Sequence, residues 1–175
     1  MKKSHATLLV LMMMGLAGRA SAVSLTFGHW LVATSTDGNY SYAATVNRQG
    51  EVFGEFCAYR SASCRWLLAV RTSCRFGDVY PILANSSSGA NPVAIFCVGA
   101  VGHRIYGMAL MNREKLEQSI AHAAQVGFAV PLDDGGFTVA NFQLNGRVQA
   151  TSFLQKSFFA EIQRRRQAQA AEQPL

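Results

Sequence analysis

The chain has 175 residues, half of them apolar and 15% charged, with a formal net charge of +6. This length fits one ordinary domain, and the composition excludes a disordered, low-complexity, fibrous or solenoid-repeat protein. We therefore expect a compact globular protein, whose fold and function have to be inferred from its residue patterns.

The first 22 residues have the features of a secretory signal peptide. Two lysines precede an uncharged run over residues 6–17, and small residues follow at Ala20 and Ala22. This pattern predicts cleavage before Val23. The alternative is an uncleaved membrane anchor, but about a dozen apolar residues are too few to cross a hydrocarbon core of about 30 Å.

Cleavage leaves a mature chain with a net charge of +3, because residues 1–22 carry three basic residues and no acid. The C-terminal segment over residues 163–175 supplies +2 of this charge, so the body over residues 23–162 is nearly neutral. Nucleic-acid-binding domains take much of their affinity from a strongly basic face, so we expect no nucleic-acid partner. We predict one β-rich domain over residues 23–163 and a disordered basic and polar tail over residues 164–175. The mature protein, without a transmembrane segment, is expected in the periplasm or outside the cell.

All four cysteines belong to the mature chain, at Cys57, Cys64, Cys74 and Cys97. An even number of cysteines in an oxidising compartment predicts two disulfides, for which three connectivities are possible. Their spacing matches neither a C-x-x-C redox pair nor the paired close spacings of a zinc site.

Strand pairing favours one of the three connectivities. If residues 51–59 and 64–71 form a hairpin with Arg60 and Ser61 at its turn, Cys57 lies directly opposite Cys64. Side chains that face each other across a non-hydrogen-bonded pair are close enough to form a bridge. The remaining two cysteines would then pair with each other.

The N-terminal part of the mature chain is strand-like. Residues 24–34 have apolar side chains at both odd and even positions, which indicates one strand with both faces partly covered. After a turn at residues 37–39, residues 40–47 alternate between apolar and polar side chains, with Tyr40 and Tyr42 on the apolar face of a half-buried strand.

The middle of the chain predicts further strands at residues 79–84, 93–98 and 103–108. A polar span at residues 85–92, rich in Asn and Ser, separates the first two and indicates a loop. Such a loop at the end of a sheet is a common place for recognition, although a plain connector is the alternative.

One internal helix is expected after residue 111. Asn112 can accept a hydrogen bond from a free amide at the helix start, and Leu116 and Ile120 share one face. The helix is predicted to run to about Val126 and to end at Gly127.

The C-terminal third predicts three strands in a meander, at residues 128–132, 137–144 and 147–152, with a hairpin at Asn145-Gly146. A final amphipathic helix would place Leu154, Phe158 and Ile162 on the body. The expected fold class is therefore α+β: a mainly antiparallel, sandwich- or barrel-like sheet with one internal and one C-terminal helix.

Several of these segments resemble the invasion-associated locus B family of exported bacterial proteins. The matching features are a Trp-Leu-Val strand at residues 30–32, a helix ending at Gly127, a Val-Pro-Leu strand at residues 130–132, and residues 142–146 followed by Ala150. The resemblance spans much of the mature chain. It implies a non-enzymatic periplasmic or surface-associated protein and assigns no catalytic residue.

Recognisable catalytic motifs are missing from the sequence. It has no G-x-S-x-G elbow, no H-E-x-x-H pair and no Gly-rich phosphate loop. The least implausible grouping is His103 with Asp78 and a hydroxyl from residues 86–88, while a surface role for these residues is the simpler interpretation. We expect no enzyme activity, cofactor or metal site.

Two segments repeat the order arginine, small polar residue, cysteine, arginine, aromatic ring. They supply the candidate partner-binding residues Arg60, Arg65, Trp66, Arg71 and Arg75. Guanidinium groups beside aromatic faces bind carboxylates and phosphates well. The alternative is that these arginines only solvate the outer face of a hairpin.

We therefore expect a non-catalytic exported protein that binds a protein or an anionic envelope component. An inhibitor or immunity protein against a cell-wall-acting enzyme is the alternative, with the loop at residues 85–92 as its contact segment.

Overall fold

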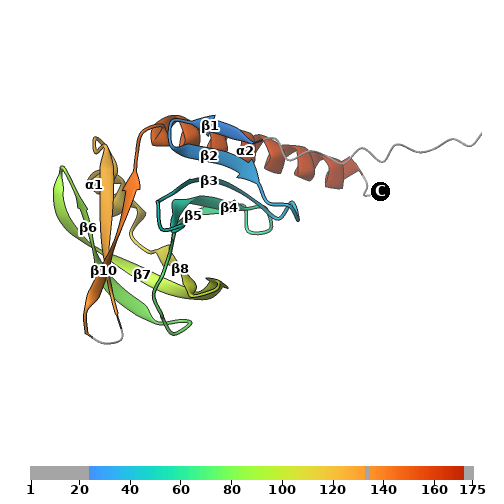
Figure 1. The fold of residues 1–175 in the computed structure, drawn as a ribbon. Coiled ribbons are helices and arrows are strands. Elements are labelled where there is room, and N and C mark those ends of the chain that lie inside the picture. Colours follow the sequence, from blue (N-terminus) through green and yellow to red (C-terminus); the bar gives the residue numbers. More distant parts are fainter. Residues whose placement is uncertain (1–23, 133–134, 172–175) are drawn as a thin grey trace, which may run out of the picture.

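The computed structural model describes residues 24–132 and 135–171, which form ten strands and two helices (Figure 1). The predicted signal peptide lies outside the described residues. The strands are β1 (Leu25–Phe27), β2 (Trp30–Thr34), β3 (Tyr40–Val46), β4 (Val52–Ala58), β5 (Ser63–Val70), β6 (Val79–Ser86), β7 (Gly89–Gly102), β8 (Ile105–Leu110), β9 (Gln125–Pro131) and β10 (Phe137–Gln143). The helices are α1 (Arg113–Ile120) and α2 (Arg147–Ala171).

All ten strands belong to one antiparallel sheet with the order β1-β2-β3-β4-β5-β8-β7-β6-β9-β10. Seven of the nine neighbouring pairs follow each other along the chain, as hairpins and meanders do. The sheet is open, with β1 and β10 at its two ends. The prediction of an α+β fold made mainly of antiparallel strands is confirmed.

The sheet curls so that its two ends share one core. The ring of Phe53 on β4 stacks on Trp66 of β5 at 5.0 Å between centroids. The same ring lies 4.9 Å from Phe128 on β9 and 5.6 Å from Phe142 on β10. Because one side chain contacts both halves of the sheet, we call the face that carries it the inner face and the opposite face the outer face.

The single strand predicted at residues 24–34 is in fact a hairpin. Gly28 and His29 form the turn between β1 and β2, and Gly28 has φ +56°. A Cβ at residue 28 would lie 2.6 Å from the carbonyl oxygen of Asn145, and the His29 amide donates to that oxygen at 3.0 Å. Glycine is therefore required here both by the backbone conformation and by the close approach of another segment.

Strand β3 is half-buried as predicted, but with its faces exchanged. Ser41 and Thr45 are buried on the inner face, while Tyr40 and Tyr42 lie outside. The polar face can be inner because its hydroxyls are bonded: Ser41 pairs with Thr34 at 3.0 Å and with Tyr59 at 2.6 Å. Alternation alone does not tell which face a helix will cover.

The loop predicted at residues 85–92 is mostly strand. β6 and β7 pair up to Ser86 and Gly89, which leaves a turn of two serines. Ser86 is held by a hydrogen bond from its hydroxyl to the Ser119 carbonyl at 2.6 Å. The contact segment expected for the inhibitor alternative is therefore a tight hairpin.

Helix α1 is shorter than predicted. The Asn112 side chain accepts from the Lys115 amide at 3.0 Å, so the predicted N-cap is confirmed. The helix ends at Ile120, however, and Gly127 lies within β9. Every second side chain of residues 125–131 is apolar and faces the core, as in a strand. The pairing of these residues with β6 and β10 overrides the helical pattern of the sequence.

The strand predicted at residues 147–152 is the first part of α2. Buried positions four residues apart, at Ala150, Leu154, Phe158 and Ile162, have the period of a helix from the start of this segment. The helix crosses the inner face of β1 to β4, and its C-terminal end extends beyond the sheet (Figure 1). Residues 164–171, predicted as disordered tail, are helical, and residues 172–175 lie outside the described residues.

Candidate binding surface

The disulfides have the predicted connectivity. Cys57 and Cys64 are directly paired between β4 and β5, with 3.9 Å between their Cα atoms. The second bridge joins Cys74 to Cys97. Two bridges that use all four cysteines are typical of a chain that folds in an oxidising compartment.

The five candidate arginine and tryptophan residues do not form one patch. Arg60 precedes β5 and Arg71 follows it, so the eight-residue strand separates them by roughly 25 Å. Arg71 donates from Nε to the Gln49 carbonyl at 3.1 Å. Trp66 is a core residue on the inner face, with Nε1 donating to Glu117 at 3.4 Å. The sequence echo therefore reflects two cysteines, each followed by an arginine, rather than a shared site.

The second repeat is attached to β7 by its disulfide. Beside Cys74, Phe76 is 73% exposed, and its ring lies edge-on to Phe96 at 6.3 Å. The Gly77 amide donates to the Cys97 carbonyl at 3.1 Å. Arg75 and Phe76 consequently lie next to β7, whereas Arg60 belongs to the turn between β4 and β5.

The outer face carries an apolar hollow, which we call the outer trough. Its volume is about 540 Å³, within the range of roughly 300–1,000 Å³ that is usual for ligand sites. The residues that line it come from β3, β4, β5, β7, β8 and the turn before β5: Tyr40, Val52, Phe56, Ala58, Ser61, Ser63, Arg65, Leu67, Ala69, Val98, Val101 and Gly107. The inner face of the same strands is filled by the core.

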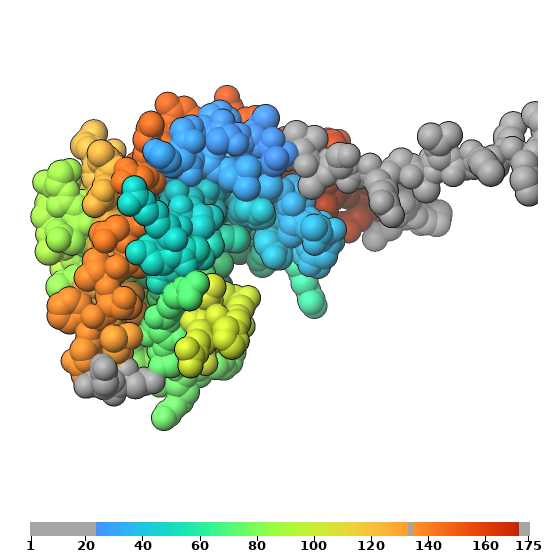
Figure 2. Space-filling view, viewed as in Figure 1, coloured from blue at the N-terminus to red at the C-terminus, as the bar shows by residue number. Residues whose placement is uncertain are grey.

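A curled hairpin makes one wall of the trough. The pairing of β7 with β8 is irregular between Cys97 and Gly99 and again between Ala100 and Gly102, and bulges of this kind bend and twist a strand. The tip of the hairpin, yellow-green in Figure 2, stands out below the blue and blue-green strands.

The absence of a side chain at Gly107 lets two valines of β7 pack directly against β8. A Cβ at residue 107 would lie 2.8 Å from a methyl group of Val98 and 2.9 Å from one of Val101. Val101 remains 61% exposed on the wall that these residues form. Two aromatic rings also line the trough, Tyr40 and Phe56, with 6.4 Å between their centroids.

Arg65 is the one charged residue of the trough lining. It also lines a neighbouring hollow of about 390 Å³ that contains Phe96, Ala109 and Met111. Within residues 24–132 and 135–171, Arg65 has no ion pair or side-chain hydrogen bond, whereas Arg113, on the same second hollow, is paired with two carboxylates. Arg65 is therefore an exposed cation with apolar surface on two sides.

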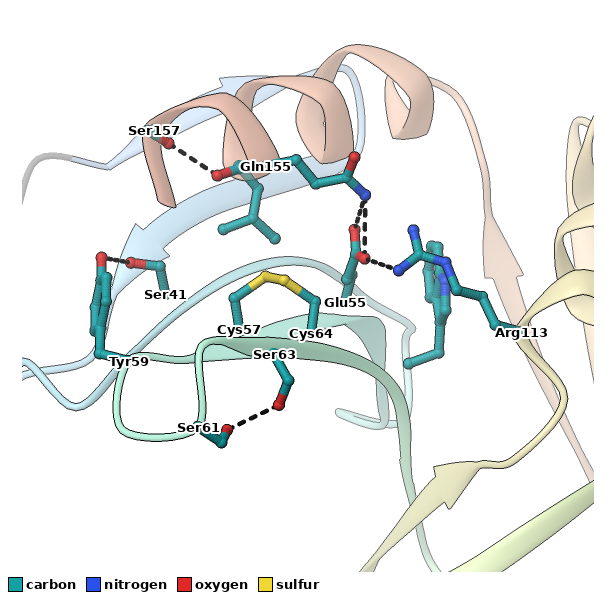
Figure 3. Close-up of a disulfide and its surroundings, with 12 residues drawn as sticks. Ser41, Glu55, Cys57, Tyr59, Ser61, Ser63, Cys64, Arg113, Gln155 and Ser157 are labelled. Atoms are coloured by element: carbon teal, nitrogen blue, oxygen red, sulfur yellow. Dashed lines mark hydrogen bonds and ion pairs between the residues drawn. A yellow bond between two sulfur atoms is a disulfide. The ribbon is translucent and has the colours of Figure 1, made fainter. Parts of the chain in front are cut away.

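A buried polar cluster lies behind this surface, between β4, β5 and the two helices (Figure 3). The Glu55 side chain is fully buried and accepts from Gln155 at 3.0 and 3.1 Å and from Arg113 at 3.0 Å. Arg113 also pairs with Glu117 at 2.8 Å. The cluster joins α1 and α2 to the sheet.

Burial sets the electrostatics of this region. Desolvation raises the pKa of the Glu55 carboxyl, against the smaller opposing effects of Gln155 and Arg113. Desolvation also lowers the pKa of Arg147, whose guanidinium donates to the Ile120 carbonyl at 3.3 Å. Both groups hold elements together and neither lines the outer trough.

The residues considered as a catalytic grouping lie apart. Asp78 precedes β6 and accepts from Tyr80 at 3.3 Å, whereas Ser86 is at the far end of the same strand. His103 is in the turn between β7 and β8. In the described parts of the chain, no three His, Cys, Asp or Glu side chains are close enough to share a metal ion.

Sequence reasoning missed the trough, apart from Arg65. The signal was present in β4 and β5, where both faces carry apolar side chains: Phe53 and Leu68 point inward, while Phe56 and Leu67 point outward. An antiparallel strand with one solvated face normally alternates with polar residues. Apolar residues on both faces of these strands therefore indicate that the outer face is a candidate binding surface.

Comparison with solved structures places the fold. The crystal structure of invasion associated protein B from Bartonella henselae aligns with a TM-score of 0.51 and 15% identity, over 76% of this chain and 96% of that chain. The fold resembles that of invasion associated protein B. The resemblance expected from the sequence is thus confirmed at the level of the fold.

No protein-family model matches the chain, and no curated protein matches it. Within the described residues, neither helix has the length and apolarity needed to cross a membrane.

Proposed function

We propose that this protein is a non-catalytic, exported binding protein that holds a protein or an anionic envelope component on its outer trough. The observation that carries the proposal is the trough itself: an uncovered apolar surface on a sheet whose inner face is filled, with the unpaired Arg65 in its lining. Contiguous apolar patches on a protein surface commonly mark interaction sites.

Export is part of the proposal. The leader pattern at residues 1–22 and the two disulfides both fit a protein that matures in the periplasm or outside the cell. The structure with the similar fold belongs to a protein named for its association with invasion, which is compatible with work at the cell envelope. Intact-mass measurement of the protein from envelope fractions should give a chain that begins at Val23 and has no free thiol. A full-length chain with four reduced thiols in the cytosol would refute export.

Binding through the trough can be tested with matched variants of the mature protein in a quantitative pull-down from an envelope extract. We expect Arg65→Ala to lower recovery of each specific partner about 10-fold or more, because a charge-assisted contact contributes about 1.5–3 kcal/mol. Leu67→Glu should abolish recovery.

Arg71→Ala serves as the control, since this arginine is also exposed but lies at the far end of β5. If Arg71→Ala and Arg65→Ala reduce recovery equally, or if Leu67→Glu retains every partner, the trough is not the binding surface.

A further inference from the structure

The chemistry of the trough lining limits what the trough can hold. Four of the lining residues are polar, namely Tyr40, Ser61, Ser63 and Arg65. Two of these already satisfy each other, because the hydroxyls of Ser61 and Ser63 lie 2.8 Å apart. The lining therefore offers a long apolar surface with few hydrogen-bonding groups.

Most of the backbone beneath the trough is already hydrogen-bonded. β4 is paired on both sides, with β3 and β5, and β5 is paired with β8 over residues 67–70, whereas residues 63–66 of β5 pair with β4 alone. A peptide laid across the paired strands could not add to the ladder there, and each N–H or C=O group that it buried against them would go unpaired at a cost of about 1–3 kcal/mol. A hydrocarbon chain has no such groups and carries no such cost.

The positive charge of the trough lining indicates which polar group the ligand carries at one end. The trough lining contains a guanidinium and no carboxylate, and the Arg65 side chain lies between the two hollows with no protein partner among the described residues. An arginine beside apolar surface favours a carboxylate, which it can bind through two parallel hydrogen bonds.

From these observations we propose that the outer trough binds a long-chain fatty acid, with its hydrocarbon chain along Phe56, Leu67 and Val101 and its carboxylate on Arg65. This inference rests on the proposed function and names the ligand class for the same surface. The open shape of the trough leaves one side of the chain near solvent, so we expect reversible binding.

The direct test is fluorescence titration of the mature, oxidised protein with a naturally fluorescent C18 polyene fatty acid below its micellar concentration. Palmitate and the alcohol of equal chain length then serve as competitors. We expect saturable binding with a 1:1 stoichiometry, and palmitate should compete at least 10-fold better than the alcohol.

Two variants assign the roles. Arg65→Met keeps an unbranched apolar side chain and removes the charge, so it should weaken binding of palmitate about 10-fold or more and change binding of the alcohol little. Leu67→Glu should abolish binding of both competitors. Val139→Glu, at an exposed apolar position on β10 outside the trough, is the control and should bind like the wild type. Near-ultraviolet circular dichroism of the buried Trp30 and Trp66 reports whether each variant is folded.

The result that would overturn the inference is no saturable binding by the folded wild type, or equal competition by acid and alcohol with no effect of Arg65→Met. If the pull-down still finds a protein partner that depends on Leu67, the fatty-acid inference fails alone. If neither experiment depends on the trough, the proposed function fails as well.

Discussion

Glu55 is the residue whose charge depends most on hydrogen bonds from its neighbours. Its carboxylate is fully buried on β4, and the fold supplies two donors, Gln155 from α2 and Arg113 from α1. Arg113 itself is half exposed. Buried charges without partners are costly, so the positions of both helices are coupled to this one group.

Because Glu55 is buried, we expect its contribution to the free energy of unfolding to depend on pH. Burial raises the pKa of Glu55 in the folded protein above its unfolded value of about 4.3, so the folded state binds this proton more tightly. The stability that Glu55 contributes is fully present below the unfolded pKa and is lost as the pH rises through the folded pKa. Relative to Glu55→Gln, the free energy of unfolding of the wild type should therefore fall as the pH rises from about 4.3 towards neutrality.

Urea unfolding of both proteins across this range, followed by tryptophan fluorescence, measures the difference. A wild type that gains stability relative to Glu55→Gln as the pH rises would contradict this prediction. It would mean that the ion pair with Arg113 outweighs desolvation.

Two adjacent phenylalanines on α2 offer a matched pair. Phe158 is fully buried against the inner face, whereas Phe159 is 55% exposed. Phe158→Ala should lower the free energy of unfolding by about 3–5 kcal/mol, and Phe159→Ala by less than about 0.5 kcal/mol. Equal losses in urea unfolding would show that α2 does not pack as described.

At the level of elements, strands were easier to predict than their connections. The hairpin of β4 and β5 follows from alternation and from cysteines placed on both strands, and it is present with Cys57 opposite Cys64. The Asn112 cap was readable for a similar reason, since a side chain bonds a backbone amide three residues away. Both features depend on local geometry.

The turn signals predicted where the chain reverses direction, but not whether a strand or a helix follows. Asn145-Gly146 suggested a β-hairpin, yet Gly146 leads directly into α2. The residues that decide this are distant in sequence: the His29 amide bonds the Asn145 carbonyl, and Trp30 donates to the Gln143 carbonyl at 3.0 Å. Contacts between the first and last parts of the domain cannot be deduced from either segment alone.

The two disulfides should contribute unequally because they close loops of different length. Their cysteines are 7 and 23 residues apart, which corresponds to about 2.5 and about 3.5 kcal/mol from chain entropy. Each bridge has one fully buried cysteine, so the cavities left by alanine should be comparable.

Urea unfolding without reductant should therefore show a larger loss for Cys74→Ala/Cys97→Ala than for Cys57→Ala/Cys64→Ala. The reverse order would show that packing around the short bridge, rather than loop entropy, controls its contribution.

At the scale of the whole molecule, the predicted α+β class with a mainly antiparallel sheet was correct, although the sheet is open, and the five candidate binding residues do not lie together. Five residues were expected to act together because they recur in sequence, and only Arg65 lines the trough. Which face of β4 and β5 stays uncovered depends on where α2 packs and on the curl of the β7–β8 hairpin. Both are long-range properties of the chain.

The proposed function depends most on the outer trough being occupied in the cell. A photoreactive phenylalanine derivative at position 101, on the trough wall, can be compared with the same group at position 139 on β10, since both valines are at least half exposed. We predict that crosslinked adducts form from position 101 and not from position 139, and that Arg65→Glu removes them. Equal labelling at the two positions, or adducts from position 139 alone, would contradict a binding role for the trough.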